Sequence, residues 1–108
     1  IKYIVKKIIN LRIFDDESNI MNKSIKDVNG SILSISQFTL YASTKDGNRP
    51  SYSNAMKKDT AVEYYNLFNE LLSKENIIVK TGIFGADMKL NIMNDGPVTI
   101  IIDSKDKW

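Results

Sequence analysis

The sequence predicts an α+β domain: a strongly curved, mixed β-sheet or partial barrel with one long helix packed against it. Apolar residues recur at helical spacing between about Thr60 and Ser73, which predicts the long helix. Short apolar or alternating runs, bounded by turn residues, predict strands over much of the remaining chain. A length of 108 residues fits one domain that buries roughly two-thirds of its unfolded surface, so we assign residues 1–108 to a single domain.

The chain opens with apolar residues at helical spacing, which predicts a first, short helix. These residues are Ile1, Ile4, Val5, Ile8 and Ile9. Residues 11–14 form a short, partly alternating run before the acidic turn 15–19, which indicates a brief strand or a helix exit into a loop. Asn29-Gly30 is a hairpin-type turn signal, and the apolar run 31–41 after it predicts a strand buried largely on both faces.

The second half of the chain alternates one helix with strand-like runs. Residues 44–51 contain Asp-Gly and Arg-Pro steps and predict a loop, after which Asp59 or Thr60 is placed to cap the long helix. Residues 76–84 and 98–102 are apolar, whereas residues 89–94 alternate between polar and apolar as in a half-buried strand. We therefore predict three further strands after the long helix.

Composition excludes several classes of chemistry. The chain has no histidine and no cysteine. This excludes Ser-His-Asp and Cys-His catalytic sites, disulfide bonds, and zinc sites with His or Cys ligands. The net charge of +2 is carried almost wholly by lysine and permits a nucleic-acid partner without demanding one. No apolar stretch approaches the length of a membrane span, which predicts a soluble protein, and the lack of cysteine suits the cytoplasm. The first residue is Ile1 rather than Met, so we expect an N-terminally incomplete domain.

Two segments differ from their surroundings. Ser36, Gln37 and Thr39 place hydrogen-bonding side chains in an otherwise apolar run, so they either satisfy neighbouring backbone groups or face a ligand. The second segment, residues 94–99, contains Gly96-Pro97 between two strand-like runs. It is either an ordinary turn or a special backbone element, since X-Pro is the bond at which a cis peptide is cheap.

Five motifs resemble those of a known enzyme family in order and approximate spacing. They are Leu11-Arg12-Ile13-Phe14, Ser36-Gln37-Phe38-Thr39-Leu40, Gly47-Asn48-Arg49-Pro50-Ser51, Phe84-Gly85-Ala86-Asp87-Met88 and Asn94-Asp95-Gly96-Pro97-Val98-Thr99. The chain resembles the D-aminoacyl-tRNA deacylases, formerly called D-tyrosyl-tRNA deacylases, over essentially its whole length. The family's N-terminal segment, which supplies opening strands and an arginine, has no counterpart in it.

The resemblance implies a homodimer, joined through the motif-bearing strands, whose sites lie at the interface and bind the acceptor end of D-aminoacyl-tRNA. In one subunit, Ser36, Gln37, Phe38 and Thr39 would line a pocket as the catalytic segment. The other subunit would insert Gly96 and Pro97, joined by a cis bond in the family, as the chiral filter. Residues Phe84, Gly85, Ala86, Asp87 and Met88 would lie near the terminal adenosine, and the small Ala61 would leave room for the aminoacyl group. The resemblance implies no metal, no other cofactor and no membrane partner.

An aminoacyl ester is already activated, so positioning and backbone N–H donors can supply much of the rate. We expect the terminal ribose 2'-hydroxyl to help activate water, in preference to Thr39 acting as a nucleophile; a structural role for the Thr39 hydroxyl stays open. Steric exclusion by Gly96-Pro97 would reject L-aminoacyl groups and admit glycyl ones.

Two alternatives come from other classes of protein. The first is a non-catalytic dimeric module that binds tRNA or single-stranded nucleic acid, which the lysine surplus suits. In the second, both motifs serve only dimer packing, although a polar segment makes a poor interface core.

Overall fold

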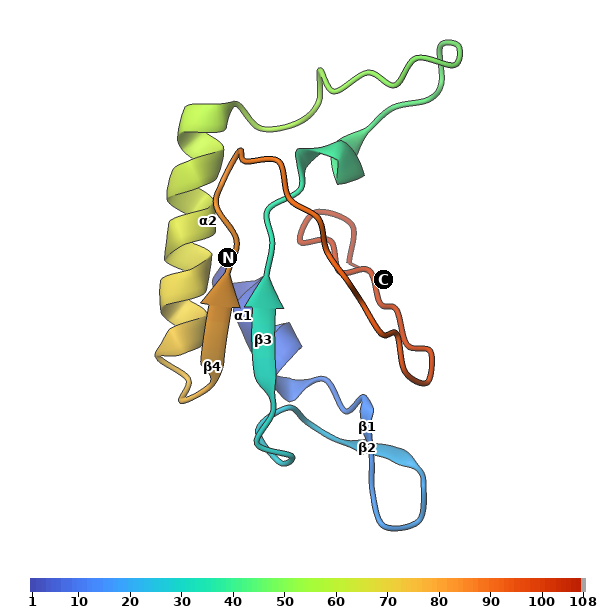
Figure 1. Cartoon of the computed structure of the whole chain (residues 1–108), viewed down its shortest axis with the longest axis vertical. Helices are drawn as coiled ribbons and strands as arrows, with labels where there is room; N and C mark the ends of the chain where they lie inside the picture. Colours follow the sequence, from blue (N-terminus) through green and yellow to red (C-terminus); the bar gives the residue numbers. More distant parts are fainter. Residues whose placement is uncertain (108) are drawn as a thin grey trace.

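The computed structural model describes residues 1–107 and has the predicted α+β composition. It has two α-helices and two two-stranded sheets. Figure 1 shows how they are arranged, with a long C-terminal arm that has no regular secondary structure up to residue 107. In chain order the elements are α1 (Lys2–Asn10), β1 (Phe14–Asp15), β2 (Met21–Lys23), β3 (Ser31–Ser34), a 3-10 turn (Phe38–Tyr41), α2 (Lys58–Ser73) and β4 (Ile78–Thr81).

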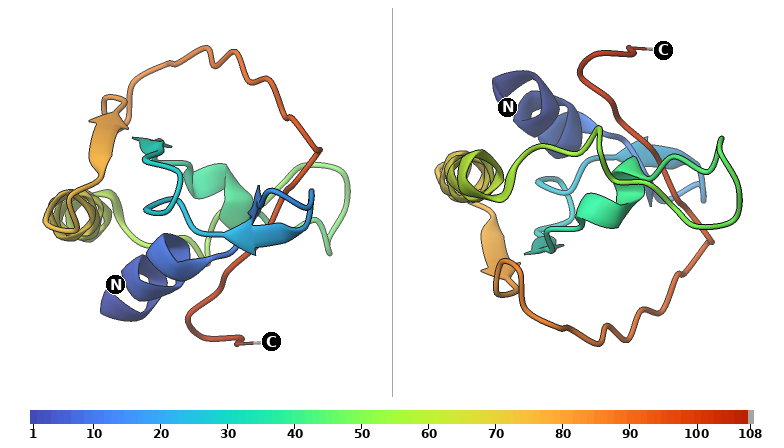
Figure 2. Two further views of the ribbon diagram at one scale, coloured as in Figure 1. Left: turned by 90° about the horizontal axis from the view of Figure 1, so that it is seen from below. Right: turned by 90° about the horizontal axis from the view of Figure 1, so that it is seen from above.

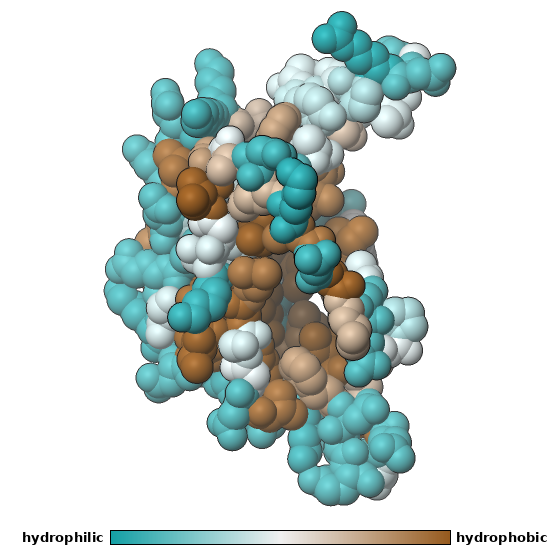
Figure 3. Space-filling model, in the orientation of Figure 1, coloured by the Kyte–Doolittle hydropathy of each residue, from teal (hydrophilic) through white to brown (hydrophobic). Residues whose placement is uncertain are grey.

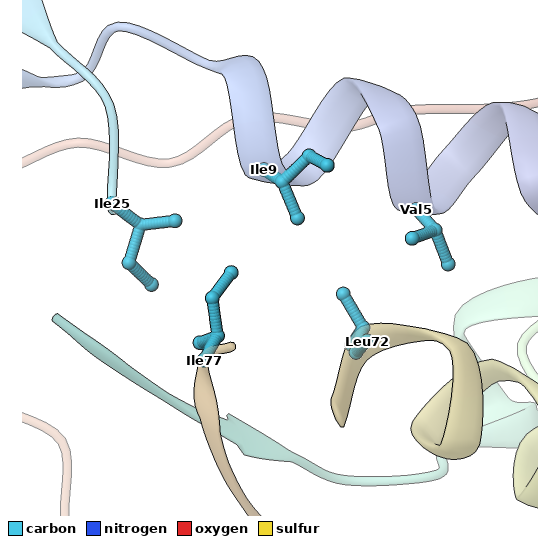
Figure 4. Packing of buried hydrophobic residues seen from close by; sticks show 5 residues of the cluster. All are labelled: Val5, Ile9, Ile25, Leu72 and Ile77. Carbon is cyan, nitrogen blue, oxygen red and sulfur yellow. The ribbon is translucent and has the colours of Figure 1, made fainter. Parts of the chain in front are cut away.

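A small apolar core joins the two helices to the start of β4. Its five buried residues are Val5 and Ile9 from α1, Ile25 from the loop after β2, Leu72 from α2, and Ile77. Figure 4 shows these side chains pointing toward one another from four separate segments. Leu72 has no accessible surface, so it is the central side chain of the cluster. The predicted helical stripe of α1 thus packs inward, as its spacing indicated.

The strands β3 and β4 pair in parallel, from Ser31 opposite Ile78 to Ser34 opposite Thr81. Parallel neighbours need a crossover connection, and here it contains the loop after β3 and the helix α2, which packs against β4. Both strands end at the same edge of the pair. Residues 35–41 and 82–88 therefore leave the sheet side by side.

The antiparallel hairpin β1–β2 closes through the carboxylate of Asp16. The backbone N–H groups of Ile20 and Ser18 donate to this carboxylate at 3.1 Å and 2.8 Å. The Ile20 hydrogen bond, followed by that of Ser18, holds the pKa of Asp16 below its ordinary value. Asn19 takes a positive φ of 59° in this turn, a conformation that asparagine tolerates better than most residues.

The predicted strand 31–41 is wrong beyond Ser34. Residues Phe38–Tyr41 form a 3-10 turn, and Phe38 and Leu40 are 61% and 86% exposed rather than buried on both faces. The strand ends because its partner β4 ends at Thr81, which leaves residues after Ser34 without a ladder. The side-chain amide of Gln37 then donates to the Thr39 hydroxyl at 2.6 Å, a local bond that favours the turn.

The long helix starts earlier than predicted, and its predicted caps are wrong. The helix α2 spans Lys58–Ser73, its N-cap is Lys57, and no side chain makes a capping hydrogen bond. Asp59 instead lies within the first turn, where a negative charge interacts favourably with the helix dipole.

The C-terminal arm, residues 82–107, contains no strand, so the strands predicted over 89–94 and 98–102 do not form in the described chain. The views of Figure 2 show the arm arching away from β4 and returning beside α1. There the ammonium of Lys107 lies 4.2 Å from the centre of the Tyr3 ring. Residues 89–94 alternate between polar and apolar side chains, but no strand within residues 1–107 forms hydrogen bonds along the arm. The predicted partial barrel is therefore not closed.

The chain is less compact than its mass suggests. Its accessible surface is 9046 Å², whereas a compact monomer of 12.3 kDa exposes about 6,100 Å². Apolar side chains of β3, β4 and the arm account for part of the excess, since Leu33, Ile78, Ile92 and Met93 are all more than half exposed. Figure 3 shows apolar side chains gathered around a hollow on this face. No helix among the described residues is long and apolar enough to cross a membrane.

Replacing Leu72 by Ala is expected to lower the free energy of unfolding by about 3 kcal/mol, because it empties the centre of a small core. Leu67→Ala on the same helix is the matched control, since Leu67 is 43% exposed, and it should cost less than about 1 kcal/mol. Urea unfolding followed by circular dichroism measures both, and equal losses would contradict the central place of Leu72.

Candidate functional site

A cleft of about 800 Å³ lies where the chain leaves the β3–β4 pair. Its walls come from the residues after β3, residues 54–56 before α2, the first half of α2, the residues after β4, and the arm at Asp103, Ser104 and Lys105. The cleft thus forms beyond the common end of two parallel strands, a frequent place for ligand sites in α/β units.

The first wall contains most of the Ser36–Thr39 segment. Ser36, Gln37 and Phe38 line the cleft, whereas Thr39 is not among its lining residues. Ser36 is half-buried, and the Phe38 ring meets the Tyr52 ring edge to face with centroids 5.0 Å apart. The Thr39 hydroxyl is 2.6 Å from the amide nitrogen of Gln37, which donates to it. Gln37 therefore links the cleft to Thr39.

The second wall is the turn after β4 together with α2. All five residues from Phe84 to Met88 line the cleft, as does Ala61 at the start of α2. The turn is closed by the Ala86 N–H, which donates to the Ile83 carbonyl at 3.1 Å, and Gly85 supplies the positive φ of 76°. The two segments that the motifs singled out, 36–38 and 84–88, thus face one space although they are far apart in the sequence.

Gly96 and Pro97 lie elsewhere on the same subunit, outside the residues that line this cleft. The bond between them is cis. Asn94 closes the loop with two hydrogen bonds to the residues after it: its side-chain oxygen accepts from the Val98 N–H at 3.3 Å, and its amide donates to the Thr99 hydroxyl at 3.2 Å. Gly96 and Pro97 are exposed, so this fixed loop projects from the arm.

The cleft offers hydroxyl, amide and backbone groups with a mixed charge. Asp87, Asp103 and Lys105 line it, and the Lys58 side chain packs beside Gly85. Within residues 1–107 no group of three or more carboxylates or other metal ligands is placed to hold a cation. The arrangement is suited to binding and orienting a substrate by hydrogen bonds and apolar contact.

Sequence reasoning missed several cleft residues. The helical spacing places Tyr65 on the apolar stripe of α2 and predicts a packing role, yet Tyr65 also lines the cleft. A tyrosine in such a stripe carries a hydroxyl that needs a partner, and this is the signal that marks it. Asp103, Ser104 and Lys105 carry no comparable signal, because only the path of the arm brings them to the cleft.

Comparisons with known proteins show which proteins this chain is similar to. The sequence profile of a family described as D-Tyr-tRNA(Tyr) deacylase matches residues 1–103. Among solved structures, a protein titled "c-Myc DNA Unwinding Element Binding Protein" is similar to this chain with a TM-score of 0.86 and 43% sequence identity. The match covers 95% of this chain and 70% of that protein's chain.

Replacing Gly82 by Ala is expected to displace Met88 and Ile35, two residues that line the cleft. An added Cβ would lie 2.5 Å from the Met88 sulfur and 3.0 Å from Cδ1 of Ile35. Both atoms lie near the ends of flexible side chains that can shift, so we expect a loss of about 1 kcal/mol, at the low end of the cost of overpacking. The double variant with Met88→Ala should recover part of this loss, because it removes the nearer atom. A double-mutant cycle on urea unfolding gives the coupling, and strictly additive losses would show that Gly82 and Met88 do not meet.

Proposed function

We propose that the cleft of this chain, which belongs to the D-Tyr-tRNA(Tyr) deacylase family, holds the aminoacylated 3' end of tRNA. Members of this family are hydrolases that act on D-aminoacyl-tRNA. The reaction is hydrolysis of the ester between a D-amino acid and the terminal ribose, with L-aminoacyl-tRNA rejected. The observation that supports it most directly is the meeting of segments 36–38 and 84–88 across one cleft, since both come from family motifs.

The cleft suggests how the two ends of the substrate are held. Phe84, with its ring against Tyr65 at 5.8 Å, is placed to pack against the terminal adenine, and the turn 85–88 surrounds the ribose. Ala61 has the smallest side chain on its helix turn and leaves space for the amino-acid side chain. Backbone N–H groups near Ser36 and Gln37 would stabilise the oxyanion of the tetrahedral intermediate.

Activation of water is assigned to the tRNA rather than to a protein base. The chain has no histidine, and an aminoacyl ester needs positioning more than strong base catalysis. The neighbouring ribose 2'-hydroxyl lies next to the ester in every aminoacyl-tRNA and would orient the attacking water. Thr39 is then a structural hydroxyl, a role that fits its hydrogen bond from Gln37.

Stereoselectivity is assigned to the Gly96-Pro97 backbone of a second subunit. Backbone carbonyls facing the substrate α-carbon would leave room for hydrogen and collide with any side chain on that side. The hydrogen bonds of Asn94 brace the Gly96-Pro97 loop. Because Gly96 and Pro97 are exposed, the loop would be free to enter the cleft of a partner subunit.

A homodimer is part of the same proposal, and the exposed surface of the chain supports it. The accessible surface exceeds that of a compact monomer by about 3,000 Å², and a standard protein interface buries about 800 Å² on each partner. A second copy would cover the exposed apolar residues of β3, β4 and the arm.

A second candidate is a nucleic-acid-binding module without turnover. The solved structure that is 43% identical is titled as a DNA unwinding element binding protein, and the lysine-rich surface here suits phosphate contacts. Binding of DNA or tRNA that weakens steeply with salt, without any release of a D-amino acid, would favour this candidate. Salt-dependent binding together with turnover would favour the enzyme.

Replacing Thr39 by Ala should leave substantial deacylation of D-tyrosyl-tRNA, within about tenfold of the unmodified chain, because the hydroxyl is structural in this proposal. Loss of a nucleophile would instead cost several orders of magnitude, and Thr39→Ser would then restore activity. The companion measurement uses tRNA ending in 2'-deoxyadenosine, which should bind but be cleaved far more slowly. An acyl-enzyme trapped on Thr39 would reverse the assignment.

Glycyl-tRNA should be hydrolysed at an appreciable rate, well above L-alanyl-tRNA. A filter that rejects substrates by steric collision finds no side chain to exclude in a glycyl group. If selection instead depended on contact with the D side chain, the glycyl ester would lose about 1–3 kcal/mol of transition-state binding for the missing apolar contact. A deacylation series with D-alanyl, glycyl and L-alanyl esters on tRNAs of matched acceptor sequence measures this. If glycyl and L-alanyl esters resist equally while the D-alanyl ester is cleaved, the steric account of Gly96-Pro97 must be abandoned.

A further inference from the structure

We propose that Tyr65 is a positioning residue that fixes the two walls of the cleft relative to each other, an inference that rests on the proposed function. Its hydroxyl binds the backbone at the end of β3, and its ring packs against the wall that follows β4. No motif of the resemblance includes this residue.

One backbone atom lies at the junction of the two walls. The Ser34 carbonyl accepts the Tyr65 hydroxyl at 2.7 Å and the Gly82 N–H at 3.2 Å. Ser34 is the last residue of β3 and Gly82 directly follows β4, so this carbonyl marks the point where both chains leave the ladder. Ser34 is only 7% exposed, and water therefore competes poorly for its carbonyl.

The Tyr65 ring reaches the second wall. It contacts Phe84 with centroids 5.8 Å apart and ring planes inclined at 46°. The same side chain thus touches the backbone that leads into Ser36 and the first cleft residue after β4. Leu72 lies seven positions further along α2, on the same helical face, and is buried in the core. The helix therefore connects both walls to the buried core of the fold.

The hydroxyl of Tyr65 distinguishes a positioning role from simple packing on the apolar stripe. A phenylalanine would fill the apolar stripe of α2 equally well, whereas a partly buried hydroxyl requires a partner. Its partner here is the residue two positions before Ser36. Because catalysis by positioning is sensitive to small displacements, with about 100-fold lost for roughly 1 Å, a bond at this point affects rate more than affinity.

The test compares Tyr65→Phe, which removes only the hydroxyl, with Tyr65→Leu, which also removes the ring. Tyr64→Phe is the matched control, because Tyr64 is the next residue of α2 and is 49% exposed. With D-tyrosyl-tRNA as substrate, Tyr65→Phe should lower kcat by about 10-fold to 100-fold and change KM by less than about twofold. Tyr65→Leu should also raise KM, since Phe84 loses its support, and Tyr64→Phe should change neither constant.

Amide hydrogen exchange, read out residue by residue in the full chain, tests the contact without activity. Tyr65→Phe should speed exchange in residues 35–38 and 82–86 while Leu72 and Ile77 keep their rates, and Tyr64→Phe should leave both groups unchanged. If the unmodified chain is inactive on D-tyrosyl-tRNA, the proposed function is refuted. Amide hydrogen exchange would still test the contact between the Tyr65 hydroxyl and the Ser34 carbonyl. Unchanged kcat in Tyr65→Phe, or faster exchange throughout the core, would overturn the positioning role.

Discussion

The parallel pairing of β3 with β4 is the constraint on which the rest of the structure depends. Because the two strands run in one direction, the chain must cross over between them, and α2 lies in that crossover. The same constraint makes both strands end at one edge. The segments that follow them therefore enclose one space, and the candidate site is a consequence of how the strands pair.

The crossover helix also joins the site to the core. One end of α2 carries Ala61 and Tyr65 at the cleft, and the other carries Leu72 among α1, Ile25 and Ile77. The ion pair between Lys26 and Glu75, at 2.8 Å, ties the loop after β2 to the residues just beyond the helix. The buried core and this exposed ion pair thus lie toward one end of α2, and the cleft lies toward the other.

Local sequence signals predicted the helices better than the strands. The apolar spacing of α1 and of α2 determines which faces pack, and both helices formed close to the expected residues. A strand needs a neighbour, however, and no local pattern tells whether one exists. Residues 35–41 have no neighbouring strand because β4 ends at Thr81. The alternating residues 89–94 have no neighbouring strand in the described chain. Segments 36–38 and 84–88 were singled out by resemblance, whereas Tyr65 and Gly82 gain their importance from tertiary contacts that periodicity does not encode.

The long separation between the paired strands also bears on how the molecule folds. Ser31 and Ile78 lie 47 positions apart in the chain, so forming their ladder closes a large loop at an entropic cost of about 3 kcal/mol. Helices form within about a microsecond and contacts between distant segments form later, since the closure cost precedes the gain from pairing. The cleft, which exists only at the end of that ladder, is accordingly among the last parts of the chain to assemble. Nascent chains therefore acquire their helical scaffold before they acquire a binding site.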